Sequence, residues 1–144
     1  MADYCSVTRT SSFRVTDEEK FKELLKGLFA FSPFEDDITV YTEEKDGEMW
    51  YTLYCEGDFE YRVNYEDKDS EWNMTIFNEE FQKILHPNDV YLQWTQGNEK
   101  FRFFSATALI ITKDRIESLD FSDCICCKIR QLIKDDKFSM TDIM

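Results

Sequence analysis

Alternation of apolar and polar side chains over residues 58–66 constrains the fold of this chain more than any other feature. Phe59, Tyr61, Val63 and Tyr65 would lie on one side of an extended chain, and the intervening residues, all charged or polar, would lie on the other. A strand of this kind buries one face and leaves the other in water, which is typical of antiparallel sheets. The pattern therefore predicts an antiparallel sheet with a solvated face.

Turn signals divide the rest of the chain into further short strands. Asp46-Gly47 is a strong signal for a two-residue hairpin loop, and Gly57-Asp58 and Gly97-Asn98 are candidates for two more tight turns. The strand over residues 99–112 is apolar on both faces from 101 to 111, which predicts a central position in the sheet. Strands are expected at residues 8–15, 38–42, 48–56, 59–65, 90–96 and 99–112, with a short one at 116–119.

Three segments have the spacing of amphipathic helices. The first begins at Thr16, which would form a capping box with Glu19, and the third begins at Ser122 or Asp123. The second is expected around residues 76–85. The stripes predicted to face a core are Phe21, Leu24, Leu25 and Leu28 in the first helix, Ile76, Phe77, Phe81, Ile84 and Leu85 in the second, and Ile125, Ile129, Leu132 and Ile133 in the third.

The element order β-α-β-β-β-α-β-β-α predicts an α+β fold, with two or three helices packed on one face of a mostly antiparallel sheet. A single domain over residues 1–144 is expected, because the length suits one core and the four Gly and two Pro leave no flexible linker. Thirteen Phe, seven Tyr and three Trp are too many for a disordered acidic chain. Residues 137–144 are expected to be a loose tail.

The acidity of the chain is concentrated in residues 35–71, an acidic β region. This region carries fourteen Asp or Glu against three Lys or Arg, whereas residues 1–34 balance at five acids and five bases. An acidic surface attracts basic proteins and repels nucleic acid and anionic lipid. No cluster of Lys and Arg offers a binding site for phosphates, so direct nucleic-acid binding is not expected.

Other functional classes find little support in the sequence. No apolar run approaches the ~20 residues of a membrane span and no signal peptide is recognisable, so we expect a soluble cytoplasmic protein. Its oligomeric state is expected to be a monomer or a small homo-oligomer. No nucleophile elbow or phosphate loop is present, and we expect neither catalysis nor a cofactor.

Two segments resemble metal sites without meeting their requirements. Cys124 and Cys127 have C-x-x-C spacing but lack a second ligand pair, so we expect them to pack in the core as small apolar residues. Residues 67–71 open like a calcium loop, but Trp72 stands where Gly is needed and Asn78 where Glu is needed. A solvated loop is expected there, with no metal site beyond weak cation binding at Asp67 and Asp69.

Three stretches of the chain resemble a group of small acidic, largely uncharacterised proteins carried by bacterial conjugative elements and phages. They are RTSSFRVTDEEKF at residues 9–21, GNEKFRF at 97–103 and ALIIT at 108–112. The resemblance implies an accessory role. Small acidic proteins of mobile elements often disarm host defence, as antirestriction and anti-CRISPR families do by mimicking DNA or blocking a nuclease groove.

The leading hypothesis is therefore a non-enzymatic inhibitor that occupies the basic nucleic-acid-binding groove of a host defence nuclease or a similar protein. The alternative is a protein-interaction or regulatory module whose acidic face is only solvated. If Tyr51 and Leu53 face the core, Trp50 and Tyr54 lie on the other face, where they could anchor a partner or pack under a helix. The candidate partner-binding residues are Glu43, Glu44, Asp46, Glu48, Glu56, Asp58, Glu60, Glu66, Asp67, Asp69, Glu71, Trp50, Tyr54 and Trp72.

Overall fold

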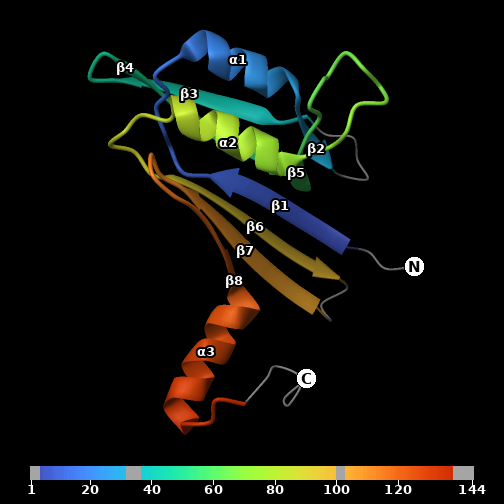
Figure 1. Ribbon diagram of the computed structural model, residues 1–144, viewed down its shortest axis with the longest axis vertical. Coiled ribbons are helices and arrows are strands. Elements are labelled where there is room, and N and C mark those ends of the chain that lie inside the picture. The colour runs from blue at the N-terminus through green and yellow to red at the C-terminus, as the bar shows by residue number, and fades with distance from the viewer. Residues whose placement is uncertain (1–3, 32–36, 100–102, 138–144) are drawn as a thin grey trace.

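The structure is a computed structural model that describes residues 4–31, 37–99 and 103–137. It confirms the α+β fold. The strands of its main sheet are β1 (Tyr4–Thr10), β3 (Thr39–Lys45), β4 (Glu48–Glu56), β6 (Tyr91–Glu99), β7 (Phe103–Ile111) and β8 (Ile116–Asp120). They lie in the order β3-β4-β1-β6-β7-β8, and every neighbouring pair is antiparallel (Figure 1).

The hairpin between β3 and β4 forms as predicted. Asp46 and Gly47 have φ angles of 54° and 78°, and positive values at both positions define the two-residue turn that matches the twist of a hairpin. Lys45 pairs with Glu48 directly across this turn. The strand β4 has the bounds that the sequence predicts.

The first strand lies closer to the N-terminus than residues 8–15. β1 ends at Thr10, because the chain then leaves the sheet to cross the core. Phe13 and Val15 each make only a single bridge, to Tyr51 and to Leu85. Their placement as regular strand residues is therefore wrong, although Phe13 is buried.

The helices α1 (Glu18–Lys26) and α2 (Met74–Ile84) lie side by side on one face of the main sheet (Figure 1). The cap of α1 is Asp17, whose carboxylate accepts the N–H of Lys20 at 3.0 Å. The predicted cap, Thr16, instead donates its hydroxyl to the carbonyl oxygen of Ile84. The cap of α2 is Asn73.

An aromatic cluster between the helices and the sheet forms the core. The ring of Phe13 lies at its centre, with centroids 5.6 Å from Phe21, 5.1 Å from Phe81 and 5.3 Å from Tyr91. Edge-to-face contacts of this kind favour a single arrangement of the rings beyond their burial alone. The other core residues are Leu24, Leu28, Tyr51, Leu53, Cys55, Phe59, Tyr61, Phe77, Ile84, Leu85 and Ile111.

A second, two-stranded sheet joins β2 (Leu28–Phe31) to β5 (Asp58–Tyr61). The strand β2 was not predicted, because Leu28 was assigned to the apolar stripe of the preceding helix. Gly57 (φ 102°) redirects the chain from the main sheet into β5, so Gly57-Asp58 does not close a hairpin. The predicted strand 59–65 is correct only for its first half, and Val63 is exposed.

The half of the main sheet that contains β6, β7 and β8 also differs from the strands and turns that the sequence predicts. Gly97 and Asn98 do not form a turn, since they extend β6 and pair with Ser6 and Cys5 of β1. The strand β7 is an inner strand of the sheet, because it pairs with β6 on one side and β8 on the other, although β1 and β6 occupy the middle of the strand order. Glu99, where the predicted strand 99–112 begins, instead ends β6, and residues 100–102 lie outside the described residues.

The last helix, α3 (Phe121–Ile133), packs against β7 and β8 and projects from the far end of the sheet (Figure 1). Its cap is Asp120, whose carboxylate accepts the N–H groups of Ser122 and Asp123. The predicted buried stripe is wrong at its end, because Leu132 is 70% exposed and Ile133 53% exposed. Of the predicted tail at residues 137–144, residues 138–144 lie outside the described residues.

Candidate functional site

The face of the main sheet opposite α1 and α2 is open over β3, β4 and β1. Tyr51, Leu53 and Cys55 of β4 point into the core, whereas Trp50 and Tyr54 point to the other face and are only half-buried. Among the described helices, α1 and α2 pack on the core side and α3 packs against β7 and β8. We define the open face by Val7, Arg9, Tyr41, Glu43, Trp50, Thr52, Tyr54, Glu56 and Trp94, which share it through strand register.

Two arginines place their guanidinium groups over aromatic rings of the open face. The guanidinium carbon of Arg14 lies 4.5 Å from the ring centroid of Trp50, and that of Arg9 lies 5.9 Å from the ring of Trp94. A hollow of about 430 Å³ lies beside them, lined by Arg9, Tyr41, Thr52 and Tyr54. The open face therefore offers partly exposed aromatic rings, of which Trp50 and Trp94 make cation–π contacts.

The predicted acidic residues separate into three groups. Glu43, Glu44, Asp46 and Glu48 lie on the β3–β4 hairpin; Glu56, Asp58 and Glu60 lie where β4 passes into β5; and Glu66, Asp67, Asp69 and Glu71 lie in the loop before α2. The hairpin turn and this loop lie at opposite ends of the α1 and α2 layer (Figure 1). The acidic residues therefore do not form one continuous array, and among them Glu43, Glu48 and Glu56 lie on the strand face that carries Trp50 and Tyr54.

Internal ion pairs neutralise little of this acidity. Among the described residues of the acidic β region, one carboxylate forms an ion pair with a Lys or Arg. This is Glu48, which pairs with Arg14. Asp58 accepts a hydrogen bond at 3.0 Å from the hydroxyl of Ser6. In the loop, Asp67 accepts the N–H of Asp69, which stabilises a local turn. The remaining carboxylates of the three groups leave their charge available to a partner.

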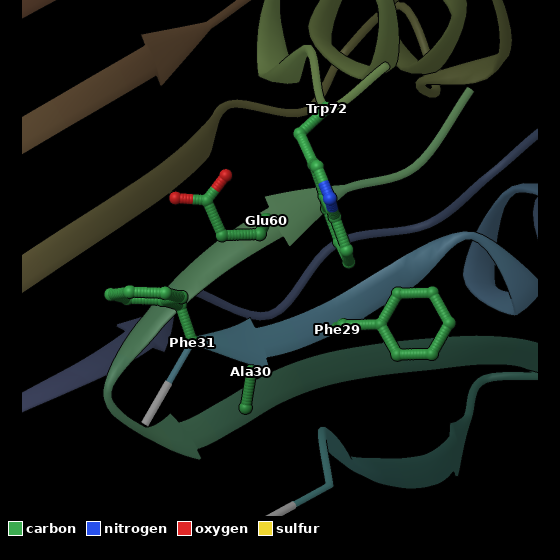
Figure 2. Close-up of a pocket in the computed structure, with 5 residues that line it drawn as sticks. All are labelled: Phe29, Ala30, Phe31, Glu60 and Trp72. Atoms are coloured by element: carbon green, nitrogen blue, oxygen red, sulfur yellow. The ribbon is translucent and has the colours of Figure 1, made fainter. Parts of the chain in front are cut away.

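A second candidate site lies on the outer side of the β2–β5 sheet. Phe29, Ala30, Phe31, Glu60 and Trp72 line a pocket of about 370 Å³ (Figure 2). Phe29 lies directly across from Glu60, and Phe31 across from Asp58, so these side chains share one face of the small sheet. Trp72 stands with Phe29 on one side and with Phe31 and Glu60 on the other (Figure 2). The predicted anchor Trp72 thus lies beside the small sheet, bridged to Arg62, whereas Trp50 and Tyr54 lie on the main sheet.

Charged groups surround the rings of this pocket. The guanidinium carbon of Arg62 lies 4.6 Å from the ring centroid of Trp72 and 5.8 Å from that of Phe29. Burial of the Glu60 carboxylate, together with the nearby charge of Asp58, raises the pKa of Glu60 above its ordinary value. Glu60 is therefore a carboxylate that has lost part of its hydration and would be stabilised by a cation.

Sequence patterns missed several residues of both sites. Phe29 and Phe31 follow Gly27 in an apolar run, and the end of α1 at Gly27 is the signal that a new element begins there. Arg9 and Trp94 face each other across β1 and β6. This pairing depends on strand order, which the sequence alone does not give.

The prediction for the C-x-x-C pair differs from the structure. Cys124 and Cys127 are exposed and Cys126 between them is buried, so the expected packing of the C-x-x-C pair in the core is wrong. Within the described part of the chain, no group of three His, Cys, Asp or Glu is placed to hold a metal ion. None of the described helices is long and apolar enough to span a membrane.

Comparisons with protein-family models, with curated proteins and with solved structures returned no match for this chain.

Proposed function

We propose that this protein is a non-enzymatic inhibitor that binds a basic, nucleic-acid-handling protein, such as a host defence nuclease, through the open face of its main sheet. The observation that carries the proposal is the placement of Trp50 and Tyr54 beside Glu43 and Glu56 on a face that α1 and α2 leave uncovered. Trp and Tyr dominate binding energy in protein interfaces, and surrounding carboxylates favour a basic partner. The sequence resemblance to accessory proteins of mobile elements supports the same role in the bacterial cytoplasm.

The separation of the acidic residues into three groups bears on how the protein would inhibit its partner. A regular imitation of the nucleic-acid backbone requires carboxylates in one continuous row, and those of the hairpin and of the loop lie at opposite ends (Figure 1). We therefore propose docking of the aromatic open face, with Glu43 and Glu56 at its rim. The acidic groups elsewhere would speed association by long-range attraction, an effect that salt screens.

The test is capture of proteins from a bacterial lysate at low and high salt, followed by a DNA-binding assay of the captured protein. The wild type should retain a basic partner at low salt, release it at high salt and reduce its DNA binding. The double variant Glu43→Gln and Glu56→Gln should lose this partner. The matched control, Glu19→Gln and Glu23→Gln on the exposed side of α1, removes the same charge and should keep it. Equal capture by both double variants would contradict the proposal.

The alternative, an interaction module whose acids only confer solubility, is favoured by the edge position of β3. All seven residues of β3 are exposed, and its outer edge has no partner strand in the described sheet. Charges on such an edge prevent edge-to-edge aggregation. In that case Trp50→Ala and Tyr54→Ala would abolish binding, whereas Glu43→Gln and Glu56→Gln would leave it unchanged at every salt concentration.

A further inference from the structure

The pocket of the β2–β5 sheet combines aromatic faces with a carboxylate. Phe31 is 70% exposed, Trp72 48% and Phe29 36%, so three large rings meet solvent at one place. Exposed apolar patches of this kind commonly mark binding sites. The volume of about 370 Å³ suits a single side chain or a small ligand, near the lower limit of ligand pockets.

The rings of this pocket already hold one cation of the protein itself. Arg62 lies over Trp72 and Phe29, on the evidence of the short distances to both ring centroids. An aromatic face attracts a cation through its quadrupole, and a tryptophan has two such faces. The side of Trp72 that faces Phe31 and Glu60 borders the pocket (Figure 2).

The negative charge of the pocket favours a cationic ligand. Glu60 and Asp58 place two carboxylates on the outer face of the small sheet, where Arg62 is the cation that the described residues provide. A cation that enters the pocket on the side of Trp72 nearer to Glu60 would meet the Trp72 ring and the Glu60 carboxylate, with Phe31 at the border of the pocket (Figure 2). A neutral ligand would leave the Glu60 carboxylate without a partner.

We propose that the pocket formed by Phe29, Ala30, Phe31, Glu60 and Trp72 binds the side-chain ammonium of a lysine from another protein. The methylene stem of lysine packs on the aromatic rings, while its compact ammonium group reaches Glu60. This site lies on a different sheet from the open face, so it stands or fails independently of the inhibitor proposal.

The test uses the full-length protein and two short acetylated and amidated peptides, Gly-Lys-Gly and Gly-norleucine-Gly, which differ only in the ammonium group. The indole N–H signals of the three Trp residues, assigned from single Trp→Phe variants, report where each peptide binds. The lysine peptide should shift the Trp72 signal saturably, with a dissociation constant on the order of millimolar. The signals of Trp50 and Trp94 should stay in place, and the norleucine peptide should bind at least about tenfold more weakly.

Two variants separate recognition from folding. Glu60→Gln keeps the shape of the pocket and should weaken lysine binding about tenfold. Phe31→Ser changes a side chain that is mostly in solvent, so the fold should be retained while binding weakens. Equal shifts with the two peptides, or unchanged affinity in both variants, would overturn the proposal. If lysine binding is confirmed while the lysate experiment retains no partner, the inhibitor proposal alone fails.

Discussion

Arg14 and Asp89 are joined by hydrogen bonds at three points. The backbone N–H of Arg14 and its Nε–H both donate to Oδ2 of Asp89, at 2.8 and 3.1 Å, and Nη2–H donates to Oδ1 at 2.6 Å. The same guanidinium pairs with Glu48 and lies over Trp50. Through these contacts Arg14 connects the loop after α2 to the open face of the sheet. Asp89, its partner in that loop, is only 8% exposed.

Removal of the Asp89 charge should therefore destabilise the fold. We expect Asp89→Asn to lower the free energy of unfolding by about 2 kcal/mol, because hydrogen bonds to charged groups contribute about 1.5–3 kcal/mol and Arg14 would lose its strongest partner. Glu48→Gln is the matched control, and since the Glu48 side chain is 50% exposed it should cost less than about 1 kcal/mol. Urea unfolding followed by circular dichroism measures the free energy of unfolding of both variants. Equal losses in Asp89→Asn and Glu48→Gln would contradict the prediction that Asp89 is the stronger partner of Arg14.

The contribution of Asp89 should also depend on pH. Burial by itself would raise the pKa of Asp89, but hydrogen bonds from Arg14 and its charge outweigh this effect and hold the pKa below its ordinary value. The folded state therefore binds this proton less readily than the unfolded chain, whose aspartate pKa is about 3.9. The stability difference between the wild type and Asp89→Asn should be constant above about pH 5 and shrink below about pH 4. A difference that grows in acid would contradict this assignment.

Elements whose signals are local could be predicted from the sequence. The Asp46-Gly47 turn, the bounds of β4 and the core stripe of α2 depend on neighbouring residues alone, and all three agree with the structure. The alternation of β4 likewise put Trp50 and Tyr54 on the face opposite to Tyr51 and Leu53, but it did not show which of the two faces meets the core.

Features that depend on long-range pairing could not be predicted. Gly97 carries a turn signal, yet pairing with β1 keeps it inside β6. The periodicity of α3 shows an apolar stripe but not what covers it, and Leu132 is left exposed at the end of the helix. For the site, the sequence identified Glu60 and Trp72 separately. Only the pairing of β2 with β5 brings Phe29 to both of them.

Two glycines should respond to the same substitution for different reasons. Gly47 has φ 78° and no other atom within 4 Å of an added Cβ, so Gly47→Ala should cost about 1 kcal/mol through backbone strain alone. A Cβ on Gly27 would lie 2.7 Å from the carbonyl oxygen of Arg62 and 2.7 Å from the ring of Tyr61. Gly27→Ala should therefore cost about 2–3 kcal/mol through overpacking. Thermal unfolding compares the two variants, and a smaller loss for Gly27→Ala would show that β2 and β5 tolerate separation at this point.

The five cysteines should fall into two classes of reactivity. Cys5, Cys124 and Cys127 are exposed free thiols, whereas Cys55 and Cys126 are buried. A thiol reagent reaches a buried side chain only when the structure opens, so three thiols should react at once in the native protein and two only on unfolding. Mass spectrometry after brief labelling with iodoacetamide assigns each site. Because Cys126 is buried while its neighbours in α3 are exposed, fast labelling of Cys126 would show that this helix separates from β7 and β8. Slow labelling of Cys124 would show that another surface covers Cys124.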